Sequence, residues 1–207
     1  MRRTRLTTWC AVVLLASQSA LADLQSPEMG GFTIEVIGGD VSATNPGITV
    51  QISAYFSDQH YFAFGWSQYS LQSTDPDGVF SHIYLPAPMG SSGVCSTFSP
   101  GTLTNGGFTD ASSFQSNILG CTANPLTPIP IWKATWSTTD FTSRDVVLST
   151  TDTPWFIVYE TVGSLGGFDL VELGLFQHGS AVIHVVPAPG ASLCAIGGFV
   201  LVSRRRR

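Results

Sequence analysis

Four histidines, His60, His82, His178 and His184, are the residues of this chain best suited to proton transfer near neutral pH. A general base of this kind needs a nucleophile or a metal beside it. The sequence contains neither a G-x-S-x-G elbow nor an H-E-x-x-H pair. His184 alternates with apolar residues, which predicts a solvent-facing position in a strand, and His178 lies in a predicted turn. We therefore expect no catalytic activity.

Paired carboxylates would be needed for glycoside hydrolysis, about 5–10 Å apart across a sugar site. Glu160 and Glu172 lie in predicted strands, and Asp169 directly precedes one. Nothing in the spacing selects one pair from these residues. We expect the acidic side chains to line the solvent faces of a folded domain.

A calcium ion is the most plausible metal, because Asp75-Pro76-Asp77-Gly78 places two hard oxygen ligands in one turn. Asp58, in a neighbouring loop, could supply another oxygen. The same four residues are also a typical type I turn sequence. The sequence leaves both interpretations of Asp75 and Asp77 open.

Aromatic side chains could stack on sugar rings if they are exposed on one face of a sheet. Trp132 and Trp136 lie four residues apart in one predicted strand and therefore share a face. A β-sheet core of this size also consumes many aromatic residues. The candidates are Tyr55, Tyr61, Trp66, Tyr69, Trp132, Trp136, Trp155 and Tyr159.

Alternating apolar and polar residues predict that these side chains are carried by β-strands. The alternation is clearest at residues 48–56, after the turn Asn45-Pro46-Gly47. Residues 61–71 carry Phe62, Phe64 and Trp66 on one predicted face and Tyr61 and Tyr69 on the other, which is typical of a strand that is central or lines a rim. The other expected strands are 33–37, 79–85, 94–98, 131–136, 145–149, 155–162, 170–176 and 181–186. Residues 86–130 are otherwise expected to be mostly loop, with one or two helical turns at 112–119.

About nine short strands without a long helical pattern predict an all-β fold, a single antiparallel β-sandwich. Cys95 and Cys121 are the two cysteines of this domain, and in an exported protein they are expected to form a disulfide. The bridge would close a loop of about 26 residues and stabilise the fold by about 3 kcal/mol. Two free thiols or a metal pair are the alternatives.

Both ends of the chain place basic residues beside an apolar segment. Arg2, Arg3 and Arg5 precede the apolar stretch 9–16, and Ala20-Leu21-Ala22 offers a small-x-small cleavage site. At the other end, Val186-Pro187-Ala188-Pro189-Gly190 is followed by an apolar run, Ser203 and Arg204-Arg205-Arg206-Arg207. Because arginines beside an apolar segment stay in the cytoplasm, the residues between the two ends are expected to be exported.

The tail resembles the PEP-CTERM sorting signal of exported proteins in Gram-negative bacteria that make exopolysaccharide. Ala188 stands where that family has Glu, and the VPAPG form is similar to a planctomycete-type variant. The resemblance implies cutting near the proline motif by an exosortase, a membrane-embedded cysteine protease or transpeptidase. A plain anchor helix is the alternative, although residues 191–202 would span only about 18 Å of a core about 30 Å thick.

The charge of the exported part limits its partners. Only Lys133 and Arg144 are basic between the two ends, against all fourteen acidic residues, which gives a formal charge near −12. Such a surface repels nucleic acid and anionic lipid. The predicted organisation is a signal peptide (1–22), a β-sandwich (23–185) and a sorting signal (186–207). We expect a non-enzymatic protein of the cell surface or matrix, with an exopolysaccharide-binding module, optionally calcium-dependent, as the alternative.

Overall fold

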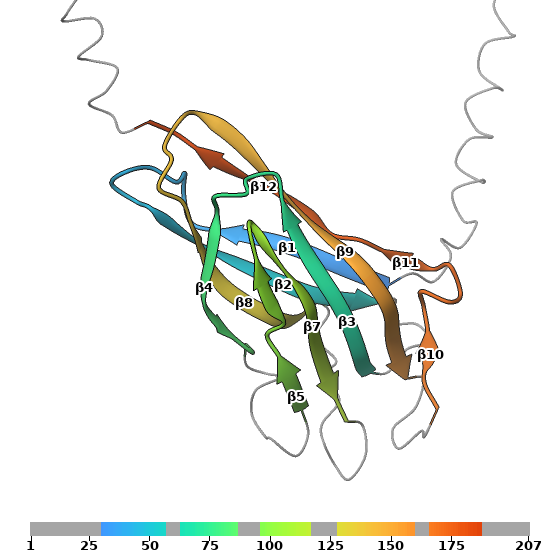
Figure 1. Ribbon diagram of the computed structural model, residues 1–207. Coiled ribbons are helices and arrows are strands. Elements are labelled where there is room, and N and C mark those ends of the chain that lie inside the picture. Colours follow the sequence, from blue (N-terminus) through green and yellow to red (C-terminus); the bar gives the residue numbers. More distant parts are fainter. Residues whose placement is uncertain (1–29, 57–62, 87–95, 117–127, 160–165, 188–207) are drawn as a thin grey trace, which may run out of the picture.

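Two β-sheets packed face to face form the domain, in a computed structural model that describes residues 30–56, 63–86, 96–116, 128–159 and 166–187 (Figure 1). These residues contain twelve strands and no helix. The strands are β1 (Gly30–Ile37), β2 (Gly47–Phe56), β3 (Ala63–Ser73), β4 (Val79–Tyr84), β5 (Ser96–Ser99), β6 (Thr102–Thr104), β7 (Gly107–Gln115), β8 (Ile129–Ser137), β9 (Arg144–Tyr159), β10 (Phe168–Asp169), β11 (Phe176–Gln177) and β12 (Ser180–Val185).

The five-stranded sheet has the order β11-β1-β2-β8-β4. The seven-stranded sheet has the order β10-β9-β3-β7-β5, with β12 also paired to β9 and β6 to β7. Among these strands only β1 and β11 pair in parallel. The predicted all-β antiparallel sandwich is confirmed.

Strand β2 shows why the sequence pattern predicts the fold. Ile48, Val50, Ile52, Ala54 and Phe56 are all buried, and the residues between them are less buried except Ser53. Because side chains alternate across a strand, this pattern puts one face of β2 into the core. Antiparallel pairing with β1 on one side and β8 on the other then fixes the register.

Aromatic rings fill the space between the sheets. Phe32 of β1 lies 4.8 Å from the ring of Tyr69 in β3, and Phe108 of β7 lies 4.7 Å from Trp132 in β8 (ring centroids). The Tyr69 hydroxyl is buried, shares a hydrogen bond with Ser113, and has its pKa raised by burial. These rings come from both sheets, so their contacts hold the two layers together.

The prediction of a strand at residues 61–71, central or lining a rim, is confirmed for residues 63–71 as a central strand, because β3 lies between β9 and β7. The prediction that Phe64 and Trp66 share a face is wrong. Phe64 is buried, whereas Trp66 is 38% exposed on the outer side. The register with β9 shifts between Phe64 and Trp66, at Gly65, and one extra residue in a strand moves every later side chain to the other face.

Residues 96–115 contain three strands, β5, β6 and β7, where one short strand at 94–98 and otherwise mostly loop were expected. The predicted helical turn at 112–119 is wrong for residues 112–115, which belong to β7 and pair with β3 and β5. Polar residues such as Ser112 and Ser113 obscure the alternation in the sequence. Tertiary pairing on both sides of β7 overrides the weak local preference.

Residues 170–175 form a turn rather than the predicted strand. Asp169 Oδ1 accepts the backbone N–H of Val171 at 3.0 Å, and Leu175 N–H donates to the Leu170 carbonyl at 2.9 Å. Gly174 has a positive φ of 71°, which favours glycine. The local hydrogen bonds satisfy the backbone within the turn, and the Leu170 side chain is buried in the core.

Candidate functional site

Two β-bulges interrupt the seven-stranded sheet on either side of its central strand. The β3–β7 register shifts between Tyr69 and Leu71, and the β3–β9 register shifts between Gln68 and Ser70. The extra residues are Asp110 in β7 and the segment 152–154 in β9. The two predicted strands 145–149 and 155–162 are therefore one strand, β9, with this bulge inside it and residues 160–162 outside the described part.

The bulges hold two aspartates in an uncommon backbone conformation. Asp110 has a φ of 57° and Asp152 a φ of 47°, in the left-handed region where Asp is tolerated better than most residues. Bulges and positive-φ residues occur frequently beside binding sites, where they redirect side chains out of the regular pleat. Here the two aspartates lie on either side of the same part of β3, close to Tyr69 and Ser70.

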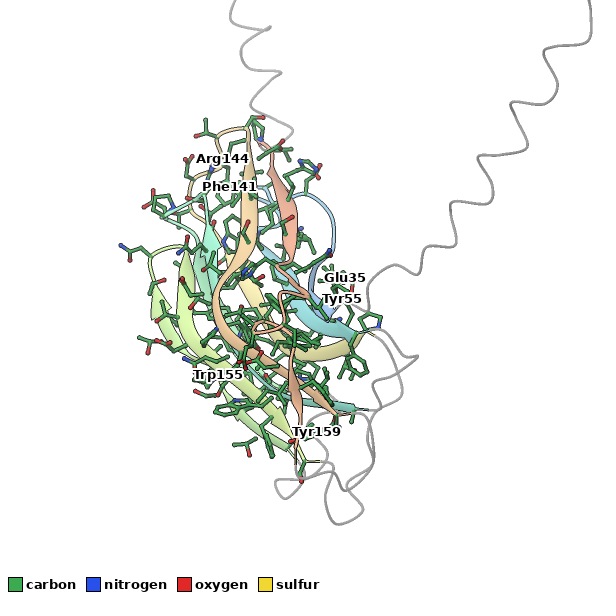
Figure 2. All side chains as sticks on the ribbon, turned by 90° about the vertical axis from the view of Figure 1, so that its right-hand side faces the viewer. Glu35, Tyr55, Phe141, Arg144, Trp155 and Tyr159 are labelled. Carbon is green, nitrogen blue, oxygen red and sulfur yellow. The ribbon has the colours of Figure 1, made fainter. Side chains whose placement is uncertain are left out.

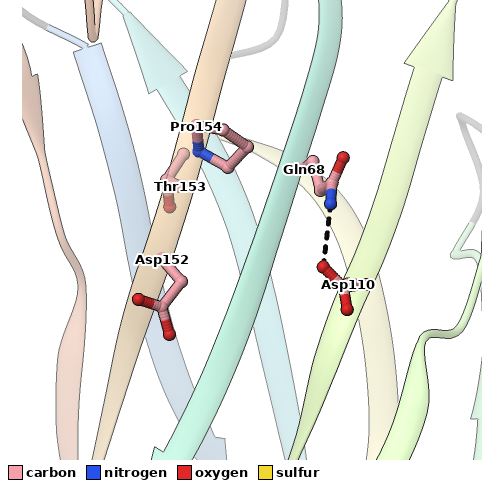
Figure 3. Close-up of a pocket in the computed structure, with 5 residues that line it drawn as sticks. All are labelled: Gln68, Asp110, Asp152, Thr153 and Pro154. Atoms are coloured by element: carbon pink, nitrogen blue, oxygen red, sulfur yellow. Dashed lines mark hydrogen bonds between the residues drawn. The ribbon is translucent and has the colours of Figure 1, made fainter.

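A shallow depression of about 350 Å³ opens between the bulges on the outer face of the sheet. We call it the bulge pocket; it is lined by Gln68, Asp110, Asp152, Thr153 and Pro154. Figure 3 shows the two carboxylates on opposite sides of β3. Gln68 donates from Nε2 to Asp110 Oδ1 at 2.9 Å, and Thr151 donates from Oγ1 to Asp152 Oδ2 at 3.2 Å.

One polar atom in this pocket and one next to it lack a hydrogen-bond partner among the described residues. The Thr153 hydroxyl and the Trp155 indole N–H are buried and have no hydrogen-bond partner among the residues that the structure describes. Thr153 itself is only 8% exposed. A buried polar group without a partner costs free energy, and such groups are rare in native folds. The pocket therefore has hydrogen-bonding capacity that this part of the chain does not use.

A pair of tryptophans, Trp66 and Trp155, borders the bulge pocket. Their ring centroids are 5.1 Å apart, and Gln68 lies directly opposite Trp155 in the register of β3 and β9. Tyr159 lies on the same face of β9. Its ring covers Gly65 of β3 so closely that a Cβ at Gly65 would lie 2.6 Å from it. Figure 2 shows Tyr159 near one end of the sandwich and Arg144, the first residue of β9, near the other.

The other predicted aromatic candidates are distributed differently. Trp132, Trp136 and Tyr69 are fully buried in the core, and Trp132 and Trp136 share a face as predicted. Tyr55 donates to the Gln177 side chain at 2.8 Å on the outer face of the other sheet. Tyr61 lies outside the described residues.

Asp75 and Asp77 lie in one turn between β3 and β4, and the Asp75 carboxylate has two protein partners. Asp77 N–H donates to Oδ1 at 3.0 Å, and Arg144 Nη2 donates to Oδ2 at 2.6 Å. The guanidinium occupies the position that a cation would take beside this carboxylate. No group of three His, Cys, Asp or Glu residues in the described ranges could hold a metal ion, and Asp58 lies outside them. The geometry favours the turn interpretation over calcium.

The histidines do not gather at one place. His184 is exposed, as predicted, and its Nδ1 lies 2.7 Å from Asp145 Oδ1. This hydrogen bond and the negative charge of Asp145 raise the pKa of His184. His178 follows β11 and approaches Thr150, whereas His82 is exposed in β4. His60 lies outside the described residues.

The predicted carboxylate candidates also stay apart. Asp169 Oδ1 accepts the backbone N–H groups of Phe156 and Val171, so this carboxylate stabilises a turn. Glu172 is exposed in that turn, and Glu160 lies outside the described residues. Sequence reasoning missed Gln68, Asp110, Asp152 and Thr153 altogether. Pro154 was the available signal, since proline within a strand marks an edge or a bulge.

Most of the predicted targeting residues lie outside the described part of the chain. This holds for Ala20, Ala22, Ala188, Pro189, Gly190 and Arg204 to Arg207, and also for the two cysteines of the predicted disulfide, Cys95 and Cys121. Of the sorting motif, Val186 and Pro187 are described, and Val186 N–H donates to the Val41 carbonyl at 2.8 Å. No helix within the described ranges is long and apolar enough to cross a membrane.

No protein-family model and no curated protein sequence matches this chain. Several solved structures share its fold. A cohesin module from the family 33 glycoside hydrolase of Clostridium perfringens ATCC13124 matches with a TM-score of 0.52 and 11% identity, over 78% of this chain and 99% of that one. The seventh ScaB type I cohesin of Pseudobacteroides cellulosolvens matches with a TM-score of 0.51 and 12% identity, over 78% and 95%.

A third similar structure contains a protein partner. It is the third cohesin of ScaC from Acetivibrio cellulolyticus, in complex with the ScaB dockerin. Its TM-score is 0.50 at 10% identity, over 76% of this chain and 99% of that chain. Similarity at this level of identity shows a common sandwich fold.

Proposed function

We propose that this chain is an exported, non-catalytic protein of the cell surface whose sandwich binds another protein through the outer face of its seven-stranded sheet. The observation that carries the proposal is the tryptophan pair beside the bulge pocket. Trp66 is 38% exposed although the core has ample aromatic residues, and exposed tryptophans are enriched at the centres of protein interfaces. The cohesin of ScaC, which shares the fold, is itself seen in complex with a dockerin.

The non-catalytic part of the proposal rests on where the reactive groups lie. His184 pairs with an exposed aspartate at the surface, and His178 contacts a threonine at another place. The carboxylate of Asp169 accepts hydrogen bonds from two backbone N–H groups. Within the described ranges, these groups serve turns and strand pairs and do not converge on a common substrate position.

Export and sorting are a further part of the proposal. The tail that resembles a PEP-CTERM signal begins at Val186, which is still hydrogen-bonded to Val41 of the domain. The sequence therefore offers no spacer between the sandwich and the apolar segment, so the domain would be held close to the membrane while an exosortase-type enzyme acts. The Cys95–Cys121 disulfide is consistent with an oxidising location and remains a prediction.

A second candidate function is binding of exopolysaccharide. The specific observation in its favour is again Trp66, because an exposed indole beside polar side chains can stack on a sugar ring. The acidic character of the pocket favours a protein with basic side chains over a neutral sugar.

Photo-crosslinking tests the proposed face directly. A benzoylphenylalanine would replace Ser112, which lies opposite Gln68 on the outer face of the seven-stranded sheet. The control places it at Gln51, on the outer face of the five-stranded sheet between Glu35 and Lys133. Irradiation of intact producing cells should give a discrete, protease-sensitive adduct from position 112 only.

The crosslinking outcomes separate the candidates. Equal adducts from both positions, or none from either, would contradict a docking role for this face. An adduct that resists protease but is removed by glycan-degrading treatment would support the exopolysaccharide function instead.

A further inference from the structure

We propose that the bulge pocket binds a positively charged side chain, arginine or lysine, presented by the partner protein. This inference rests on the proposed function, because the partner supplies the cation. It assigns a chemical role to Asp110 and Asp152, which nothing in the sequence pattern singled out.

The charge of the pocket has no counterpart within the domain. The side-chain partners of Asp110 and Asp152 are the neutral Gln68 amide and the neutral Thr151 hydroxyl. The two basic residues of the exported part lie elsewhere. Arg144 pairs with Asp75 and Asp140, and Lys133 belongs to β8 of the other sheet. An incoming cation would therefore meet two carboxylates that no basic residue of the exported sequence neutralises.

Thr153 provides the independent indication that a ligand belongs here. The residue lines the pocket and is 8% exposed, and its buried hydroxyl has no hydrogen-bond partner in the described ranges. An ammonium or guanidinium group carries only donors, so it can supply the donor that this hydroxyl oxygen lacks.

The spacing of the two aspartates favours an organic cation over a metal ion. Asp110 and Asp152 lie on the two strands that flank β3 (Figure 3), so their backbones are about 10 Å apart. Calcium requires six to eight oxygens within about 2.6 Å. The described residues offer no cluster of three metal-binding side chains. A guanidinium or ammonium on a flexible stem can lie between the carboxylates and bond each through separate donors.

The tryptophan pair completes the site. Trp66 and Trp155 border the pocket along β3 and β9, where an arginine or lysine stem can pack on the exposed ring of Trp66. A cation close to an indole face gains a further electrostatic attraction. A neutral sugar could use the same ring but would leave both carboxylate charges unbalanced.

The test uses intact protein from producing cells grown on ¹⁵N medium and follows the indole N–H signals of Trp66 and Trp155. The probes are the pentapeptide Gly-Gly-Arg-Gly-Gly and its citrulline analogue, which has the same shape without the charge. We expect saturable shifts with the arginine peptide, at least tenfold weaker binding with the citrulline peptide, and weaker binding at high salt.

Variants locate the site. Asp110→Asn with Asp152→Asn should weaken arginine-peptide binding at least tenfold, and asparagine tolerates the positive φ of both positions. The control Glu35→Gln with Asp145→Asn removes the same charge elsewhere and should leave binding unchanged. Thr153→Val should weaken binding by a smaller factor.

Three results would overturn the proposal. These are equal binding of the arginine and citrulline peptides, unchanged binding in the Asp110/Asp152 variant, and saturation by cellobiose or Ca²⁺ with the arginine peptide silent. A crosslinked adduct at position 112 together with no binding of the arginine peptide would support protein docking on this face and contradict the cation site. Arginine binding at the pocket without any adduct would show a cation site and remove the protein partner.

Discussion

Arg144 connects two segments of the chain at one end of the sandwich, the turn that holds Asp75 and the loop before β9. Its guanidinium pairs with Asp75 at 2.6 Å and Asp140 at 3.2 Å, and it donates to the backbone carbonyls of Asp140 and Thr142. Asp75 is 6% exposed, whereas Arg144 is 25% exposed. The carboxylate therefore depends more on the pair than the guanidinium does, because it is the more deeply buried charge.

Replacing Arg144 should expose this dependence. We expect Arg144→Met to lower the free energy of unfolding by about 3–5 kcal/mol, because it leaves the Asp75 carboxylate buried without its partner. Chemical denaturation at neutral pH measures the loss. Lys133→Met makes the same change at the other basic residue of the domain, which has no ion-pair partner in the described ranges, and should cost less than 1 kcal/mol. Equal losses in the two variants would argue against a special role for the Asp75 pair.

His184 gives the surface a pH-dependent contact. Asp145 raises the pKa of His184 above its ordinary value of 6.5, so the folded state binds the proton more tightly than the unfolded chain does. The small stabilisation is fully present below pH 6.5 and is lost as the pH rises through the raised pKa. An NMR titration should find that Asp145→Asn lowers the pKa of His184. An unchanged pKa in that variant would mean that the pair does not form in solution.

At the scale of strands, irregularities decide what the outer face can do. The shift at Gly65 turns Trp66 outward, and the bulges at Asp110 and residues 152–154 open the pocket. Without them, regular alternation would place these side chains differently. The strands supply the rigid frame, and the extra residues supply the site.

Gly107, at the start of β7, lies against the backbone of β3. A Cβ at this position would overlap the carbonyl oxygen of Leu71 in the neighbouring strand. We expect Gly107→Ala to lower the free energy of unfolding by about 1–3 kcal/mol, because backbone atoms must move to admit the methyl group. Thermal unfolding measures the effect. The control is Gly39→Ala, where nothing lies within 4 Å of the added Cβ, and it should leave stability within about 0.5 kcal/mol.

At the scale of the whole molecule, the two ends of the domain lie far apart. The described part of the domain begins with β1 at Gly30. Its last strand, β12, ends at Val185, which pairs with Val41 beyond the other end of β1 (Figure 1). Eight residues of β1 span roughly 25 Å. If the tail is held at the membrane, the membrane therefore lies at the Val185 end of the sandwich.

This geometry leaves the bulge pocket accessible on the side of the domain. Val185 pairs with Arg144 at the start of β9, and Asp152 lies eight residues further along that strand. At about 3.3 Å per residue, the pocket is roughly 25 Å from the end nearest the tail. A partner could reach the outer face without contacting the bilayer.

Processing of the two ends can be measured on the native protein. Mass spectrometry should find a new N-terminus near Asp23, loss of the apolar tail, and a Cys95–Cys121 peptide in non-reducing digests. Arg204–Arg207→Ala should accumulate unprocessed precursor, because the basic cluster fixes the tail at the membrane. Intact Arg207 on mature surface protein would contradict sorting and favour a permanent anchor.

The sequence by itself determined the class of fold, and it predicts the layout of the chain. Alternation at residues 48–56 and 131–136 requires strands with one buried face, and basic residues beside apolar ends require no tertiary information to be recognised. These are local properties, carried by neighbouring residues. The same local reasoning failed at residues 112–115 and 170–175, where the partners of the backbone decide the conformation.

Only the tertiary structure decided where the chemistry lies. Asp75 has Arg144 as its partner across 69 positions of sequence, and Gln68, Asp110 and Asp152 meet because β7 and β9 flank β3. A bulge depends on the register between two strands, and no single strand contains that information. For this reason the sequence could predict the sandwich, whereas the pocket on its outer face appeared only when the strands were paired.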